Sequence, residues 1–243
     1  MANVTTQRWR EAQSAEAGYW HGLTVMELLR ISAEKPIFLF TLGPELCSKL
    51  FDGKKILEIG VGPIGLSLAS FYRHKERIQE LIKTDPLSRI HLEESGLMEE
   101  LWAAPFTRWV DSLTNEGEYR QITGEELDFV EAFDCVITYN VLDHVHDPKQ
   151  ILSNAYRALR PGGELLVGVD CLSVIGRLKF EHYIRRAYKG SVLAEAHPYT
   201  FLPSHVSKMM KDVGFRGVES YGVPSLIYRW LGGATRPAFV GRK

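Results

Sequence analysis

Residues 54–69 constrain the fold of this chain more than any other segment. An apolar run leads there into three glycines, Gly60, Gly62 and Gly65, and a second apolar run follows directly. Because glycine lets the backbone turn sharply and lets a ligand approach it closely, this order predicts a strand, a tight turn and the start of a helix. The glycine spacing also fits the G-x-G-x-x-G pattern of dinucleotide sites, whereas Glu58, two places before the first glycine, favours a different ligand.

Strand-like and helix-like segments alternate along the rest of the chain. A proline followed by two glycines at 160–163 should end the helix that precedes it. The alternation predicts an α/β fold with a doubly wound, mostly parallel sheet. The expected strands are 78–84, 119–123, 133–139, 164–169, 214–221 and 237–242, and the expected helices between them include 147–159 and 203–213.

The apolar residues before the glycine turn recur at helical spacing, which predicts a separate helical segment at the start of the chain. Short helices are expected at 5–18, 23–34 and 43–51, with Pro36 ending the second. We therefore expect an N-terminal helical cap at 1–52 and a main domain at 53–243. Residues 171–202 are an insertion in the sheet pattern, with a helix at 174–188 that is either a solvated basic helix or part of a lid over the site.

Composition excludes several classes of partner. The chain has 29 basic and 30 acidic residues among 243, so its charge predicts neither a nucleic-acid nor a membrane partner. No apolar run is long enough to cross a bilayer and no signal core is present, so we expect a cytoplasmic protein. The three cysteines are widely spaced, which favours buried thiols over disulfides or a zinc site. The sequence leaves open whether two copies form a homodimer.

Ligands of doubly wound sheets lie across the carboxyl ends of the strands. The residues that follow the expected strands are therefore the candidates for ligand contact. Asp85 follows the second strand, 23 residues after Gly62, where a carboxylate can accept hydrogen bonds from both hydroxyls of a ribose. The other positions of this kind are Gly60, Gly62, Gly124, Glu125, Glu126 and Asn140.

Three further segments, 133–148, 159–163 and 197–201, extend the pattern that begins at the glycine turn. Together they resemble the class I S-adenosylmethionine (SAM)-dependent methyltransferases of the broad small-molecule group, and the resemblance covers residues 54–221. It implies a seven-stranded sheet whose last strand is antiparallel and lies between the fifth and sixth. It also implies SAM as the cofactor, S-adenosylhomocysteine as the product, and a small-molecule acceptor.

The resemblance assigns roles to the residues at the carboxyl edge. Two positions depart from the family pattern, because Ile64 replaces a frequent glycine and Thr123 a frequent aspartate. Each acid also has a purely structural alternative. Glu58 could cap backbone amides, Asp85 could be only a turn residue, and Glu125 and Glu126 could be surface acids. The implied roles are Gly60 and Gly62 beside the methionine and adenosine parts, Asp85 on the ribose, Glu125 and Glu126 facing the adenine, and Asn140 beside the sulfonium. Glu58 would orient the glycine turn or reach the amine of the ligand through water.

A general base would help a hydroxyl acceptor, and His144 just beyond the fourth strand is the candidate. Asp170 follows the fifth strand and could orient it, a pairing that resembles some sugar O-methyltransferases. The alternative is that His144 only packs against the next helix. Trp20, His197 and Tyr199 are candidates for the acceptor pocket. We expect no metal site, because Asp143, His144, His146 and Asp147 cannot converge from one turn.

These features predict a SAM-dependent methyltransferase that acts on a small molecule, with an O-methyl acceptor such as a sugar or secondary metabolite favoured. N-methylation of a small amine is the alternative within that class. A nicotinamide dehydrogenase would share the glycine turn but would not explain Glu58 or segments 160–163 and 197–201. A non-catalytic partner subunit with the same fold is the third alternative.

Overall fold

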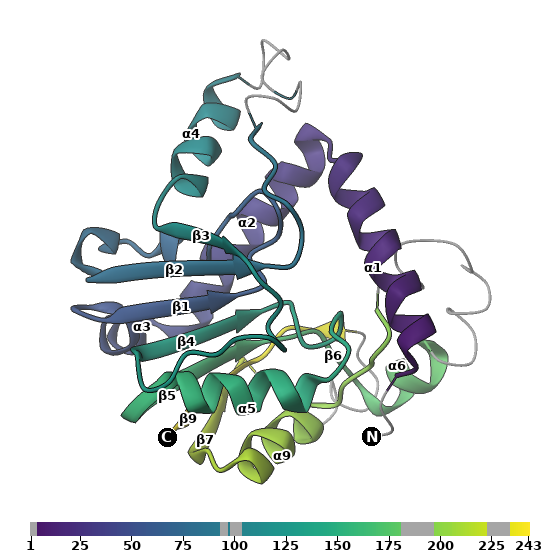
Figure 1. Ribbon diagram of the computed structural model, residues 1–243, viewed down its shortest axis with the longest axis vertical. Helices are drawn as coiled ribbons and strands as arrows, with labels where there is room; N and C mark the ends of the chain where they lie inside the picture. The colour runs from purple at the N-terminus through teal and green to yellow at the C-terminus, as the bar shows by residue number, and fades with distance from the viewer. Residues whose placement is uncertain (1–3, 93–96, 98–103, 181–196, 223–233) are drawn as a thin grey trace.

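A computed structural model describes residues 4–92, 97, 104–180, 197–222 and 234–243. Its centre is a seven-stranded sheet in the order β3-β2-β1-β4-β5-β9-β7, with helices on both faces (Figure 1). The strands are β1 (Lys55–Ile59), β2 (Glu80–Asp85), β3 (Glu118–Gln121), β4 (Phe133–Tyr139), β5 (Leu159–Gly168), β7 (Arg216–Tyr221) and β9 (Ala238–Arg242).

The strand directions confirm the predicted fold class. All neighbouring strands from β3 to β5 in the sheet order are parallel to each other. β9 lies between β5 and β7 and is antiparallel to both. The central strands are buried on both faces, which explains why 133–139 reads as a nearly continuous apolar run.

The helices that follow β1 in the chain cover this sheet. α5 (Pro148–Ala158) begins at Asp147, whose carboxylate accepts the N–H groups of Lys149 and Gln150. Its apolar side packs with α9 (Pro203–Val213) in the largest cluster of the core. α4 (Ala104–Thr114) lies near the edge strand β3 in Figure 1, and it contacts η1 (Ala69–Phe71), a 3-10 turn that is followed by a second one, η2 (Lys75–Arg77).

The N-terminal helices place a wall beside the strand ends. They are α1 (Thr6–His21), α2 (Val25–Leu42) and α3 (Pro44–Phe51). α1 stands beside the carboxyl ends of the parallel strands in Figure 1. α2 and α3 share a buried cluster with the sheet, in which Phe38 and Phe51 meet Ile137 of β4. None of the helices in the described part of the chain is both long and apolar enough to span a bilayer.

Pro36 does not end the second helix, contrary to the prediction. α2 starts at a capping box made by Thr24 and Glu27 and continues through Pro36 to Leu42. A proline inside a helix removes one backbone hydrogen bond. The turns beyond it nevertheless bury Phe38, Leu39 and Leu42, so tertiary packing outweighs the local preference.

Helix α5 ends at Ala158, close to its predicted end, but two other expectations differ from the structure, and a short second sheet was not expected. The segment after the glycine turn forms only the 3-10 turn η1, because the buried carboxylate of Glu58 binds the amides of Leu68 and Ala69. Residues 160–163 belong to β5, where Gly162 and Gly163 pair with Lys243. A second, two-stranded sheet joins β6 (Cys171–Leu172) to β8 (Ala234–Thr235), and strands this short leave no sequence pattern. Of the expected helix at 174–188, α6 (Val174–Lys179) is described and residues 181–188 lie outside the described residues.

Candidate active site

A cavity of about 360 Å³ opens at the carboxyl edge of the sheet. Gly60 and Gly62 of the glycine turn form its floor, and Asn140 follows β4 beside them. Helix α1 contributes Trp20 and helix α2 contributes Lys35 to the walls. The N-terminal helices therefore close over the strand ends at the position where doubly wound sheets bind ligands.

The glycine turn needs glycine for both conformation and space. Gly60 and Gly62 have φ angles of 73° and 76°, in the left-handed region that favours glycine. A Cβ on Gly60 would lie 2.5 Å from Cγ2 of Val141, and one on Gly62 would lie 2.7 Å from Cζ2 of Trp20. Side chains at these positions would thus collide with the loop after β4 and with α1.

Glu58 holds the turn from below. Its side chain is buried and accepts hydrogen bonds from the N–H groups of Leu68 (2.7 Å) and Ala69 (3.3 Å) and from the hydroxyl of Ser67. The structural role left open for Glu58 is therefore present in the structure. The carboxylate stabilises the backbone that shapes the cavity and does not line the cavity itself.

Asp85 holds the turn from the side of β2. Its Oδ2 accepts the N–H of Gly62 at 2.8 Å and its Oδ1 accepts the N–H of Leu87 at 3.0 Å. Burial raises the pKa of Asp85 to about 7, the negative charge of Glu16 adds to this, and the two amides and His144 oppose it. The residue expected to bind the ribose is thus in place beside Gly62, buried and close to half ionised at neutral pH.

The two acids after β3 lie differently from each other. Oε1 of Glu125 accepts the N–H groups of His146 (3.1 Å) and Asp147 (3.4 Å) and lines a small hollow of about 40 Å³ beside Gly124. Glu126 is exposed and accepts a hydrogen bond from the hydroxyl of Thr123 at 2.8 Å. Glu125 of this pair therefore borders a small hollow, whereas Glu126 faces solvent.

Asn140 adopts an unusual backbone conformation at the end of β4. Its φ angle is 59°, and its N–H donates to the carbonyl of Gly168 at 2.7 Å. Its side-chain Oδ1 is buried with no hydrogen-bond partner among the described residues. Strained conformations and unsatisfied buried acceptors of this kind are found mostly at functional sites.

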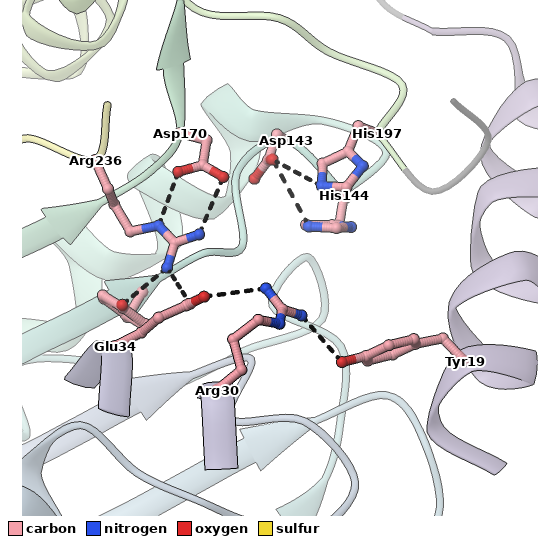
Figure 2. A network of polar contacts seen from close by, with 9 residues as sticks. Tyr19, Arg30, Glu34, Asp143, His144, Asp170, His197 and Arg236 are labelled. Atoms are coloured by element: carbon pink, nitrogen blue, oxygen red, sulfur yellow. Dashed lines mark hydrogen bonds and ion pairs between the residues drawn. The ribbon is translucent and has the colours of Figure 1, made fainter. Parts of the chain in front are cut away.

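The predicted pairing of His144 with Asp170 is not the arrangement in the structure. Both oxygens of Asp170 bind the guanidinium of Arg236, at 2.8 and 3.0 Å (Figure 2). Nε2 of His144 lies 3.7 Å from Oδ2 of Asp143, and its Nδ1 lies 3.8 Å from Oε2 of Glu16. Arg236 is 66 residues beyond Asp170 in the chain, and no sequence pattern links the two.

Arg236 connects a network across the cavity wall. Its Nη1 donates to Glu34 at 2.6 Å and to the hydroxyl of Tyr139 at 2.9 Å. Glu34 also binds Arg30, which donates to the hydroxyl of Tyr19 at 3.2 Å (Figure 2). Burial lowers the pKa of Arg236, but the hydrogen bonds and negative charge of Asp170 and Glu34 outweigh it and raise the pKa.

Two buried lysines flank the glycine turn, and sequence reasoning missed both. Lys35 lines the cavity with its Nζ 4.7 Å from the ring centroid of Tyr139. Lys83 of β2 donates to the carbonyls of Gly65 (3.1 Å) and Thr114 (2.7 Å). Burial lowers the pKa of each lysine to about 8. A lysine inside an apolar strand or helix face gives no signal of this role in the sequence.

The residues expected at the acceptor pocket divide into two groups. Trp20 and His197 line the cavity. Tyr199 does not, because it is buried in the core, where its hydroxyl donates to the carbonyl of His146 (2.7 Å) and accepts the N–H of Val4 (3.0 Å). Tyr199 therefore ties the start of α1 to the loop after β4, and its predicted contact with the acceptor is not supported.

Comparison with known proteins identifies the family. Residues 35–220 match the methyltransferase domain family, and the chain belongs to that family. A ubiquinone biosynthesis O-methyltransferase of Pseudomonas putida (strain W619) is 32% identical over 117 residues, which make up 46% of this chain and 43% of that protein. The chain thus aligns with less than half the length of such relatives.

Solved structures agree on the fold. A SAM-dependent methyltransferase of Thermotoga maritima matches with a TM-score of 0.54 at 19% identity, covering 90% of this chain and 95% of the other. The 1,6-didemethyltoxoflavin-N1-methyltransferase of Burkholderia thailandensis, solved with its acceptor and S-adenosylhomocysteine, also gives a TM-score of 0.54 at 16% identity, covering 100% and 92%. The resemblance to class I methyltransferases is confirmed.

The demand for glycine at the turn can be tested with a matched pair of variants. Gly60 and Gly53 both have left-handed φ angles, but a Cβ on Gly53 would meet nothing within 4 Å. Gly53→Ala should therefore cost only the backbone strain, about 1–2 kcal/mol. Gly60→Ala should cost about 1–3 kcal/mol more because its methyl group overlaps Val141. Urea denaturation measures both, and equal losses would contradict the close approach of Val141.

Proposed function

We propose that this protein is a SAM-dependent methyltransferase that transfers the methyl group to a hydroxyl of a small molecule. The observation that supports this best is the cavity at the carboxyl edge, where the glycine turn and Asn140 meet two imidazoles, with Asp85 bound to the amide of Gly62 behind the turn. The neighbour from Burkholderia thailandensis, which binds S-adenosylhomocysteine, has this fold over the whole chain. Membership of the methyltransferase domain family argues against a nicotinamide dehydrogenase.

The proposed cofactor lies along the glycine turn. A carboxylate has about four acceptor positions, and the amides of Gly62 and Leu87 occupy two of those of Asp85. Two remain for the ribose hydroxyls. The adenine lies toward the hollow beside Gly124, with Glu125 as its acidic neighbour, and the sulfonium lies beside Asn140.

The proposed reaction is an in-line displacement at the methyl carbon. The acceptor oxygen must lie roughly 3–3.5 Å from that carbon in a space that excludes water. We place this oxygen beside His144 and His197, with its proton leaving at these imidazoles and Asp143. Asp143 therefore replaces Asp170 in our assignment, and Asp170 shapes the opposite wall through Arg236. Trp20 closes the cavity above Gly62.

N-methylation remains the second candidate, because an amine needs only to be unprotonated and the neighbour from Burkholderia thailandensis is an N-methyltransferase. The imidazole cluster favours the hydroxyl acceptor, since an amine gains little from a group that handles a proton. A non-catalytic subunit would not need such a cluster beside the cofactor.

Calorimetry with three ligands tests the cofactor. We expect SAM and S-adenosylhomocysteine to bind with a stoichiometry of one and NAD not to bind, because the chain belongs to the methyltransferase domain family. Binding of NAD alone would overturn the proposal, and binding of none of the three would favour the non-catalytic alternative.

Ionisation of Asp85 should control cofactor affinity. Its raised pKa means that the carboxylate is mostly protonated at pH 6 and mostly ionised at pH 8, and the ionised form makes the stronger hydrogen bonds to hydroxyls. From a pKa near 7, S-adenosylhomocysteine should bind about tenfold more weakly at pH 6 than at pH 8. Asp85→Asn should weaken binding at pH 8 and flatten this dependence in calorimetry. An unchanged pH dependence in the variant would assign it to another group.

His144 should act on the chemical step and not on cofactor binding. His144→Ala is expected to lower kcat by about 10²–10⁴-fold, the range for a group that handles a proton. The dissociation constant of S-adenosylhomocysteine should stay near that of the parent. Formation of S-adenosylhomocysteine with a panel of phenols, sugars and amines measures the rate, and His74→Ala on the surface serves as the control. A rate equal to that of the control would reduce His144 to a packing residue.

A further inference from the structure

Two segments far apart in the chain bring three metal-type ligands together. Asp143 and His144 lie in the turn after β4, and His197 reaches them from the segment before α9. Oδ2 of Asp143 lies 3.7 Å from Nε2 of each histidine, and the two imidazole centroids are 4.4 Å apart. Figure 2 shows the carboxylate directed at both rings. The N–H of Tyr199, 3.4 Å from the carbonyl of Asp143, fixes this arrangement.

This convergence differs from the one considered in the sequence. The cluster of Asp143, His144, His146 and Asp147 does not form, since Asp147 caps α5 and the ring of His146 packs against Trp9. His197 takes their place. Ligand atoms of Asp143, His144 and His197 all lie within 4.8 Å of one another.

The carboxylate of Asp143 is poorly compensated. Its side chain is 3% exposed, and its Oδ1 has no hydrogen-bond partner among the described residues. No lysine or arginine in the described part of the chain forms an ion pair with it. Buried carboxylates require a partner charge or a bound cation, and the groups that approach Asp143 among the described residues are the two imidazoles. A divalent ion between the carboxylate and the imidazoles would supply that charge.

The geometry fits a small divalent ion. Ligands about 2.0–2.2 Å from a tetrahedral ion lie about 3.3–3.6 Å from one another. The two distances of 3.7 Å from Asp143 need to close by a few tenths of an ångström, and the two imidazoles, whose ligand atoms lie within 4.8 Å, need to approach each other further. Two imidazoles with one carboxylate suit Zn²⁺, Fe²⁺ or Co²⁺ better than Mg²⁺ or Ca²⁺. Glu16 lies 3.8 Å from Nδ1 of His144, which is where metal-bound histidines commonly have a carboxylate.

We propose that Asp143, His144 and His197 bind a divalent transition-metal ion whose open coordination position faces the cavity. Both histidines line that cavity, so three protein ligands leave a position that an acceptor oxygen can occupy. The binding site stands on the geometry alone, and its role in methyl transfer rests on the function proposed above.

The chemical role is that of a Lewis acid. With an ion bound, the imidazole nitrogens are ligands and no longer accept the acceptor's proton. A hydroxyl that coordinates the ion would instead lose its proton to solvent more readily, as water does on zinc. A lone pair of the bound oxygen then forms the bond to the methyl carbon while the carbon–sulfur bond breaks. The electron pair of that bond stays on sulfur, the sulfonium becomes a neutral thioether, and the ion keeps its oxidation state.

Cobalt binding tests the site without any acceptor. Full-length protein without an affinity tag is treated with EDTA and titrated with Co²⁺, whose visible absorption reports a low-symmetry site. We expect one Co²⁺ per chain, displaced by Zn²⁺ and not by Mg²⁺. Asp143→Asn and His197→Ala should each weaken binding at least tenfold, whereas His74→Ala, which removes a surface histidine, should bind as the parent does.

The outcomes separate this proposal from the proposed function. Circular dichroism and thermal unfolding first establish that each variant is folded, and a rise in melting temperature with Zn²⁺ that Asp143→Asn abolishes gives a second measure of binding. No Co²⁺ binding, or equal binding by all variants, overturns the metal site and leaves a metal-free imidazole pair. A protein that binds S-adenosylhomocysteine but does not bind Co²⁺ would contradict the metal site alone. A protein that binds Co²⁺ but binds neither SAM nor S-adenosylhomocysteine would contradict the proposed function alone.

Discussion

The glycine turn depends on buried charges that bind its backbone. Glu58 accepts two amides beyond the turn, Asp85 accepts the amide of Gly62, and Lys83 donates to the carbonyl of Gly65. Charged groups in such places satisfy backbone atoms that no sheet or helix can reach, and removing one leaves the others uncompensated. The shape of the cavity floor is therefore set by ionic hydrogen bonds, and its walls are set by the apolar packing of the N-terminal helices.

The walls of the cavity divide its charges into two groups. Arg236 binds Asp170 and Glu34, and Arg30 also binds Glu34, so two guanidinium groups neutralise these two carboxylates on the side of α2. Asp143 and the two imidazoles form the other group, which has no such cation among the described residues. This separation explains why Asp170 cannot orient His144. Asp143, His144 and His197, near the end of β4, are therefore the groups that can accept a proton or bind a cation.

The sequence predicted the sheet well because each central strand is a buried apolar run that ends at a turn residue. It also predicted Asp85 and Asn140 at the carboxyl edge, since strand ends follow from strand positions. It did not predict the partners of these residues. The bond from Asp170 to Arg236 and the approach of His197 to Asp143 join segments that only the complete fold brings together. Helix α2 shows the same limit, because Pro36 is a strong local signal that the packing of Phe38 and Leu42 overrides.

The raised pKa of Asp85 reflects an electrostatic cost of ionising this carboxyl that a cofactor can relieve. A raised pKa in the folded state means that this group stabilises the fold fully below its unfolded pKa, and that the contribution is lost as the pH rises through about 7. Above that pH the folded protein holds an ionised carboxylate that burial and Glu16 both oppose. Two donated hydroxyl hydrogen bonds and a nearby sulfonium would favour the ionised form, because hydrogen bonds and opposite charges lower the pKa of an acid. A ligand with these groups therefore binds more tightly because it relieves the unfavourable burial of the ionised Asp85 carboxylate. An uncharged ligand without paired hydroxyls brings no such relief.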